Sequence, residues 1–357
     1  MRRRQLPLLL TLFLAGCVGI GPHVLGRDHL DYAAALSDAQ KREMLFNVVR
    51  LRYGDAPVFL STSQVISGYT VQGTAQAGVN AYPSAARSSF FGAQGTVDYI
   101  DHPTFTFTPV TGEQFAESYI RPLSPVQLLP LAQSGLPIDV LLRLGVQAIG
   151  DLQNTNPLNG PARAGSPDFF RLLADLRTLQ VASVLSMRLL KGSSTDKEAS
   201  SIRVFFHLSE RQDPNIRHVA QETRQLLGID PSAREFEVVY GYGRLGHNRV
   251  ALLTRPILAM LVEVGSQIEV SDQDVRAGRT LETVHSAILG MRPIIAIHSG
   301  PAQPGASFVS LNYRGRWFWV NDDDFQSKAS LTVLQLLHSI AESGHAPQAP
   351  LITIPVG

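Results

Sequence analysis

A long stretch in which apolar and polar residues alternate constrains the fold of this chain more than any other feature. Between residues 58 and 107 the alternation has a period of two, which is the period of a β-strand with two different faces. Turn-forming residues at 82–84 interrupt it. We therefore predict a long β-strand, an antiparallel return that begins near residue 91, and a third strand over residues 104–108.

The two faces of the predicted hairpin, residues 65–100, differ in an unusual way. One face carries small and aromatic residues, and the other carries Thr, Gln, Gly and Asn with no charge before Asp98. Edge strands of soluble proteins usually carry lysines. Aromatic residues lie near both ends of the hairpin, about ten residues apart, which is the length that a tilted strand needs to cross a membrane. The candidates for a membrane or interface surface are Tyr69, Val71, Phe91, Val97 and Tyr99.

Two interpretations of this hairpin stay open. A single hairpin cannot cross a bilayer, because its edges would leave backbone groups unpaired in lipid, but several protomers could close a shared barrel. The favoured interpretation is a long amphipathic hairpin that lies over the helices or pairs with a neighbouring molecule in water. Both interpretations predict that the hairpin needs a partner surface.

The first seventeen residues are typical of a bacterial export signal. Arg2, Arg3 and Arg4 precede an apolar run over residues 6–13, which is too short for a spanning helix of about 20 apolar residues. The run ends in Leu14-Ala15-Gly16-Cys17, and this Cys is the only cysteine of the chain.

The Leu-Ala-Gly-Cys box resembles the bacterial lipobox. The resemblance implies cleavage after Gly16, a diacylglycerol thioether on Cys17 and an N-acyl group, so that several acyl chains anchor the protein firmly. Val18 in place of Asp implies sorting to the outer membrane of a Gram-negative bacterium. We therefore expect a lipoprotein on the periplasmic face of that membrane, with membrane lipid as its partner through acylated Cys17.

The composition of the mature chain excludes several classes of chemistry. With Cys17 lipidated, the body has no cysteine for disulfides, thiolate catalysis or Cys-ligated zinc. Loss of the three signal arginines leaves 28 basic against 30 acidic residues, a net charge near minus two, which gives no reason to expect a nucleic-acid partner. The spacing of the histidines shows no zinc motif, so we predict neither a metal nor a cofactor.

Helices and strands alternate along the rest of the chain. Ser37 is a predicted N-cap for a helix over residues 37–53, and a breaker-rich linker over 154–165 is the predicted boundary between two halves. The predicted fold is α+β, with a helical N-terminal half that contains the long antiparallel β-hairpin and a mixed α+β C-terminal half. Its parts are a signal peptide (1–16), a tether (17–35), helices plus hairpin (36–160) and an α+β domain (166–357).

Three groups of residues are candidates for a binding or catalytic role. Gly241-Tyr-Gly243-Arg-Leu-Gly246 has the spacing of a dinucleotide-binding turn, but a strand pattern follows it where a helix is required, which favours a glycine-rich hairpin turn. Arg316, Trp317 and Trp319 on one predicted strand are candidates for binding a glycan or an anionic lipid headgroup, although a packed core strand is favoured. A periplasmic hydrolase would take its acid and base from Asp323 or Asp324 and a histidine such as His298.

Three segments resemble an uncharacterised family of proteobacterial lipoproteins: residues 46–57 (FNVVRLRYGDAP), 102–115 (HPTFTFTPVTGEQF) and 316–328 (RWFWVNDDDFQSK). The resemblance implies the same outer-membrane address and brings no catalytic residue, ligand or cofactor. We therefore expect a non-enzymatic envelope component that self-associates or docks to an envelope assembly. In one form of this hypothesis, the hairpin contributes to an oligomeric pore. A periplasmic hydrolase and a glycan- or lipid-binding module are the alternatives.

Overall fold

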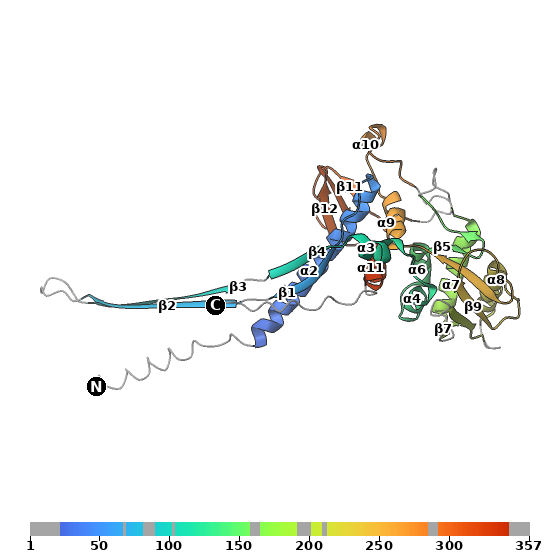
Figure 1. Cartoon of the computed structure of the whole chain (residues 1–357), viewed down its shortest axis with the longest axis horizontal. Helices are drawn as coiled ribbons and strands as arrows, with labels where there is room; N and C mark the ends of the chain where they lie inside the picture. Colours follow the sequence, from blue (N-terminus) through green and yellow to red (C-terminus); the bar gives the residue numbers. More distant parts are fainter. Residues whose placement is uncertain are drawn as a thin grey trace. The chain divides into compact units, whose positions relative to one another are not determined.

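The computed structural model describes residues 22–66, 69–80, 90–101, 104–157, 165–190, 201–208, 213–284 and 292–342. The chain divides into two compact units. Unit 1 comprises residues 1–57 and 115–344, and unit 2 comprises residues 58–114 and 345–357. The elements of both units are shown in Figure 1, and the fold is α+β, as the sequence predicts.

Unit 2 contains two antiparallel strand pairs. β1 (Leu60–Ile66) pairs with β4 (Thr104–Pro109), and β2 (Tyr69–Asn80) pairs with β3 (Phe90–Asp101). We call the β2–β3 pair the ribbon. The short helix α3 (Gly112–Phe115) lies where unit 2 adjoins unit 1 in sequence. The antiparallel return predicted from the alternation is confirmed.

Register gives the ribbon two different faces. Twelve residue pairs run from Tyr69 opposite Asp101 to Asn80 opposite Phe90 without a bulge. Directly opposite residues share a face, because side chains alternate along each strand. Apolar positions therefore face apolar positions on one side, as in Val71–Tyr99, Gly73–Val97 and Val79–Phe91. The other side holds polar pairs such as Thr74–Thr96 and Gln76–Gln94.

A six-stranded mixed sheet forms one part of unit 1, in the order β6-β5-β10-β9-β8-β7. Its strands are β5 (Val146–Ile149), β6 (Leu152–Gln153), β7 (Leu185–Leu190), β8 (Ser201–Phe206), β9 (Glu235–Tyr240) and β10 (Arg249–Thr254). Its helices are α4 (Pro125–Leu128), α5 (Pro130–Gln133), α6 (Ile138–Gly145), α7 (Pro167–Val181) and α8 (Pro214–Leu227). On β8 the side chains of Ile202, Val204 and Phe206 are buried while Arg203 and Phe205 are half-exposed, so one face of the sheet forms the core.

This sheet crosses the boundary that the sequence suggested. β5 and β6 precede the linker over 154–165 and β7 to β10 follow it, yet β5 pairs with β10. The linker therefore lies inside unit 1, and the structural division falls at residues 57–58 and 114–115 instead. A segment rich in glycine and proline shows where a helix or strand ends. Only the pairing of strands that are distant in sequence shows whether the segments on its two sides share a core.

Helices α7 and α8 begin at side-chain caps that the sequence contains. The Ser166 hydroxyl accepts a hydrogen bond from the Phe169 backbone at 3.2 Å, and Pro167 occupies the first helical position. Asp213 caps α8 in the same way, and Gly228 ends that helix in the left-handed conformation, with φ +65°.

β9 and β10 run parallel although only residues 241–248 connect them. A parallel connection usually needs a dozen or more residues, and the hairpin turn predicted here would have made the strands antiparallel. Gly243 (φ +85°) and Gly246 (φ +67°) allow the chain to fold back, and Arg244 makes an isolated antiparallel bridge with Val250. A strand follows the glycines, so the segment lacks the helix N-terminus that a dinucleotide pyrophosphate requires.

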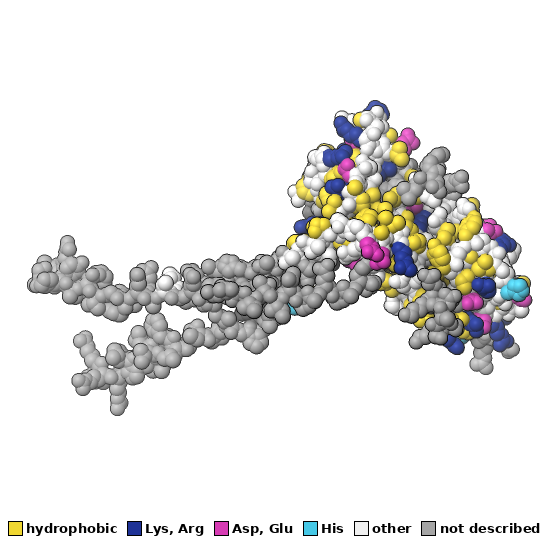
Figure 2. Space-filling view, in the orientation of Figure 1, with side chains coloured by type: hydrophobic (Ala, Val, Ile, Leu, Met, Phe, Trp, Pro, Cys, Tyr) yellow, Lys and Arg dark blue, Asp and Glu magenta, His cyan; other side chains and the backbone are white. Residues whose placement is uncertain are grey.

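A three-stranded antiparallel sheet forms the other part of unit 1, in the order β11-β13-β12. Its strands are β11 (His298–Gly300), β12 (Val309–Tyr313) and β13 (Arg316–Val320). The remaining helices of unit 1 are α2 (Pro22–Arg52), the π-helix η1 (Ala116–Ile120), α9 (Ile257–Ser266), α10 (Asp272–Arg276) and α11 (Phe325–Glu342). Acidic and basic side chains of unit 1 are interspersed on the face seen in Figure 2.

Helix α2 begins at Pro22, whereas the sequence suggested a helix from Ser37. Helical structure therefore includes most of the segment over 17–35 that we expected to be a tether, because the Ala33-Ala34-Ala35 run continues the helix toward the N-terminus. The C-terminal part of α2 packs on α9. Gly265 makes this close crossing possible, since a Cβ there would lie 3.1 Å from the Val48 carbonyl oxygen.

Two opposite charges are buried together beside α9. Arg255 is 4 % exposed and Glu263 is 2 % exposed, with Nη2 and Oε2 3.5 Å apart. The Thr155 hydroxyl and the Gln267 amide donate hydrogen bonds to Glu263 Oε1, at 2.6 and 2.8 Å. Removing one partner of such a pair leaves a buried charge without compensation, which is far more costly than the pair itself is stabilising.

We expect Glu263→Gln to lower the free energy of unfolding by about 3–5 kcal/mol, because Arg255 would lose its counter-charge. Denaturant unfolding followed by circular dichroism measures the change. The matched control is Glu235→Gln, which breaks an exposed 3.2 Å pair with Arg203 and should cost no more than about 1 kcal/mol. Equal effects of the two substitutions would contradict a structural role for the buried pair.

Candidate functional site

The residues predicted to mediate attachment and assembly are only partly covered by the structure. Cys17 lies outside the described residues. For Tyr69, Val71, Phe91, Val97 and Tyr99 the structure gives backbone and register, which place Val71, Phe91, Val97 and Tyr99 with Tyr69 on the same face of the ribbon. Among the described strands, β2 pairs only with β3, so each ribbon strand has one edge with no described partner.

The predicted ligand-binding strand is β13, and the structure separates its three candidates. Trp317 and Trp319 are half-exposed on one face of the three-stranded sheet, whereas Phe318 is fully buried on the other. Arg316 shares the face of Phe318, and its Nε donates to the Ser299 hydroxyl at 3.0 Å. The two tryptophans thus form a surface without the arginine that the sequence had grouped with them.

Polar groups surround the indole of Trp319. Its Nε1 donates to Asn321 at 2.8 Å, and its ring lies 5.8 Å from the ring of His298 between centroids. Gly300 on the neighbouring strand leaves room for the indole, because a Cβ there would lie 3.3 Å from it. An amphipathic indole held in this way can stack on a flat ligand, but the described contacts also explain it as part of the sheet.

The acid and base suggested for a hydrolase are not each other's partners in the described part of the chain. His298 Nδ1 lies 3.1 Å from Glu269 Oε2. Asp324 caps helix α11 through Ser327 and also pairs with Arg292, while Asp323 is exposed. Burial opposes ionisation of Asp324, but hydrogen bonds from Ser327 and Arg292 outweigh it and hold the pKa of this carboxyl below its usual range. This aspartate is a helix cap.

A second cluster of titratable groups, which sequence reasoning missed, lies between η1 and α11. The fully buried Tyr119 hydroxyl donates to Glu342 Oε1 at 2.8 Å and lies 2.9 Å from His338 Nε2. Burial, and then the charge and hydrogen bond of Glu342, raise the pKa of Tyr119. Burial lowers the pKa of His338, although Glu342 opposes the change. The three groups hold the two helices together.

The sequence contained no local signal for this cluster, because Tyr119 and His338 are more than two hundred positions apart. Only the register of α11 against η1 brings them together. No group of three His, Cys, Asp or Glu residues able to hold a metal ion is found among the described residues. No described helix has the length and apolar character of a membrane span.

Comparison of the chain with protein-family models, with curated proteins and with solved structures finds no significant match. The lipoprotein family that residues 46–57, 102–115 and 316–328 resemble therefore stays a prediction.

The lowered pKa of His338 predicts how stability depends on pH. As the pH falls below 6.5, the ordinary pKa of histidine, the unfolded chain binds a proton on this imidazole that the folded chain does not, so acidification destabilises the fold. We expect the wild type to lose about 1 kcal/mol more than His338→Gln between pH 7 and pH 5, measured by denaturant unfolding. Ser339→Ala, an exposed neighbour on α11, is the control and should follow the wild type. Parallel profiles for wild type and His338→Gln would contradict this assignment.

Proposed function

We propose that the protein is a non-enzymatic component of the bacterial envelope, anchored in the outer membrane through acylated Cys17, whose ribbon mediates self-association. The register of β2 and β3 carries the proposal. From the pair Val71–Tyr99 to the pair Val79–Phe91, one face of the ribbon carries only apolar residues or glycine and the other only polar residues or glycine. Within the described strands no further strand continues the ladder.

The physics of a two-stranded ladder supports an association role. An isolated hairpin is marginally stable in water, because its apolar face is uncovered and half of its backbone groups have no partner in the ladder. Pairing with another ribbon adds backbone hydrogen bonds along an edge and buries apolar surface at the same time. A second copy of the chain offers a surface of the same length and pattern.

The length of the ribbon also suits a closed assembly in lipid. Each strand has twelve residues, and a tilted strand needs about 9–11 to cross the hydrocarbon core. If ribbons from several protomers closed into a barrel, the backbone groups at every strand edge would be hydrogen-bonded. The apolar positions would then face outward, and Thr, Gln and Asn would face inward. An assembly that stays in water would instead bury the apolar faces against one another. Electron microscopy of the oligomer in detergent separates these forms.

The proposed anchor predicts the fate of the protein after Cys17→Ser. This variant is exported with a signal peptide that is cleaved without lipidation. Because it carries no acyl chains, it should move from the membrane pellet to the soluble fraction in ultracentrifugation. As a control, Val18→Asp keeps the cysteine and should remain membrane-bound. A serine variant that stays entirely in the pellet would refute anchoring at this residue.

The proposed role of the ribbon predicts that only one face tolerates charge. Val97→Lys places a cation on the apolar face and should weaken self-association at least about thirtyfold, since burying it costs about 2–4 kcal/mol. Thr96→Lys, the adjacent residue on the polar face, should leave the oligomer intact. Light scattering of detergent-extracted protein measures both. Should the wild type itself prove monomeric with a protease-sensitive ribbon, self-association is excluded.

A further inference from the structure

One edge of the six-stranded sheet has no further strand beside it among the described residues. β7 is last in the strand order, and it pairs only with β8, through six residue pairs. Leu189 on this strand is 47 % exposed, although it is a large apolar residue. We call the side of β7 that faces away from β8 the open edge. A strand edge presents backbone donors and acceptors in a row, and another strand can pair with them.

Hydrogen bonding shows which backbone groups of β7 point to the open edge. The His207 N–H donates to the Val184 carbonyl, directly before β7, at 2.7 Å. Alternate residues of an antiparallel strand bond to the same neighbour, so the even-numbered residues of β7 bond to β8. The groups that point to the open edge are those of Leu185, Met187 and Leu189. The Gln133 amide agrees with this assignment, since it donates to the Met187 carbonyl at 3.0 Å.

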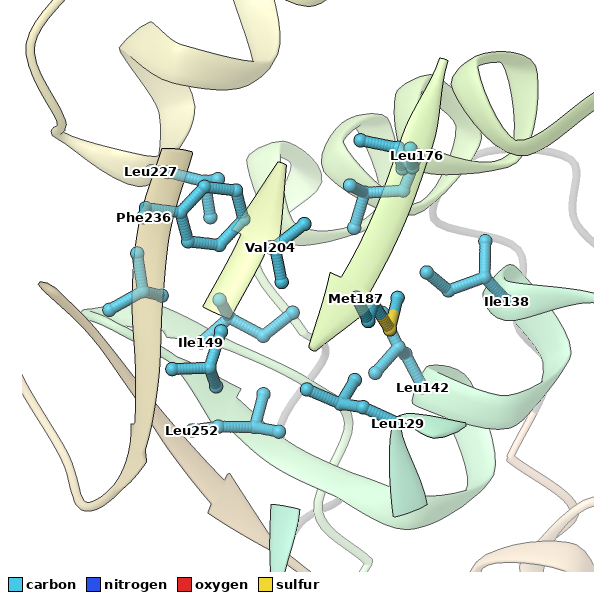
Figure 3. A pocket seen from close by; sticks show the side chains of 13 residues that line it. Leu129, Ile138, Leu142, Ile149, Leu176, Met187, Val204, Leu227, Phe236 and Leu252 are labelled. Carbon is cyan, nitrogen blue, oxygen red and sulfur yellow. The ribbon is translucent and has the colours of Figure 1, made fainter. Parts of the chain in front are cut away.

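A depression adjoins the open edge. Its free space is about 460 Å³, within the range of roughly 300–1,000 Å³ that is usual for ligand pockets. β7 contributes Leu185 and Met187 to its lining, and the other walls are the C-terminal part of α7 and the turn from α5 to α6. Figure 3 shows Met187 of β7 and Ile138, the first residue of α6. Val181 in the lining is 69 % exposed, so an apolar side chain placed here would cover apolar surface.

Two arginines give this edge a positive charge. Arg177 lines the depression, and its Nη1 donates to Gln180 Oε1 at 2.7 Å. Asp139 lies 3.8 Å from Arg177 Nε, which is longer than a hydrogen bond, so the guanidinium keeps donors for another carboxylate. On β7 itself, Arg188 is exposed and lies over the Phe205 ring, 5.0 Å from its centroid. Charge complementarity therefore favours an acidic partner.

We propose that the open edge of β7 binds an extended acidic segment of a partner protein, which adds a seventh strand to the sheet. The backbone of the segment pairs with the open edge, an apolar side chain enters the depression, and a carboxylate contacts Arg177. Residues two apart on a strand share a face, so an apolar residue and an acidic residue at that spacing fit both features. Backbone hydrogen bonds supply the affinity of such an addition, and the side-chain contacts supply its specificity.

The probe for this site is the capped peptide acetyl-Thr-Val-Thr-Glu-Thr-Val-Thr-amide. Its palindromic sequence presents the same side chains in either strand direction, with both valines and the glutamate on one face. Isothermal titration calorimetry with residues 17–357 carrying Cys17→Ser should show saturable binding of one peptide to each chain. Absence of saturation at millimolar peptide would overturn the proposal.

Methylation of peptide nitrogens tests the backbone pairing. Alternate N–H groups of an added strand point toward β7, so methylation of one alternate set should abolish binding and methylation of the other should not. One probe is methylated on its two valines, and the other on the two threonines beside the glutamate. Equal affinities of the two methylated probes would show that the peptide does not bind as a strand.

A substitution on β7 tests the same pairing from the side of the protein. Leu189→Pro removes an N–H from the open edge and keeps the hydrogen bonds to β8, and it should weaken binding about tenfold, because its ring also blocks the approaching strand. Leu189→Ala is the matched control, keeps the N–H and should bind the peptide normally. Undiminished binding by a Leu189→Pro protein with native circular dichroism would contradict pairing at this edge. If this variant does not fold, the methylated probes decide.

The carboxylate contact is tested by charge. Arg177→Gln should weaken binding of the glutamate peptide about tenfold and leave binding of the corresponding glutamine peptide unchanged, because only the carboxylate pairs with the guanidinium. Arg171→Gln changes an exposed arginine on the same helix, which pairs with Asp168, and is the matched control. It should bind both peptides as the wild type does. Equal effects of Arg177→Gln on the two peptides would exclude the proposed contact.

Light scattering distinguishes a partner segment from β7 of a second copy. The measurement uses Val97→Lys, in which association through the ribbon is already weakened. A monomer that binds the peptide supports the proposal, whereas a dimer that Leu189→Pro dissociates would replace the partner segment by a second copy. Val97→Lys leaves β7 unchanged, so failure of ribbon association and failure of peptide binding are separate results.

Discussion

The buried pair of Arg255 and Glu263 ties helix α9 to α6 and to the chain after β6, beside the six-stranded sheet. Arg255 follows β10 directly, and α9 begins two residues later. Besides Glu263, its guanidinium reaches the backbone carbonyls of Arg143 and Thr155, which belong to α6 and to the chain after β6. Helix α9 packs on α2, η1, α6 and α11. One charged side chain thus links the six-stranded sheet to the helix that the rest of unit 1 surrounds.

Removing these two charges from water is costly, and hydrogen bonds to one of the two carboxylate oxygens of Glu263 offset part of that cost. Glu263 Oε1 has two donors, and Gln267 also accepts from the Ile294 backbone through its own Oε1 at 2.8 Å. The polar network therefore continues from the linker after β6 to the segment before β11. A purely apolar core would tolerate several positions of α9, whereas paired charges and directed hydrogen bonds favour a single one.

Local patterns in the sequence predicted the elements whose causes are local. Helix α8 spans the residues between its cap and its terminating glycine, and the strand predicted at Arg316, Trp317 and Trp319 is present as β13, because capping and alternation act over a few residues. Where a distant partner decides, prediction from the sequence failed. The segment over 137–149 has the pattern of one helix, but from Val146 it is a strand, since it pairs with β10 about a hundred residues away. The parallel crossover at 241–248 and the Tyr119 cluster depend on distant partners in the same way.

The same distinction separates the faces of the ribbon from the interior of unit 1. The faces of the ribbon follow from a period of two alone, so the alternation of residue types is enough to indicate them, and register confirms which residues lie opposite one another. A small apolar gap in the core of unit 1 is lined by residues from five strands and from the helices that cover them, and Leu142, Leu176 and Leu227 are ordinary core leucines in the sequence. A gap in packing is a property of the assembled sheet and helices, since it arises where side chains from separate elements fail to meet. Sequence periodicity therefore predicts the surfaces of single elements well, while a gap inside the core becomes visible only once the elements are placed together.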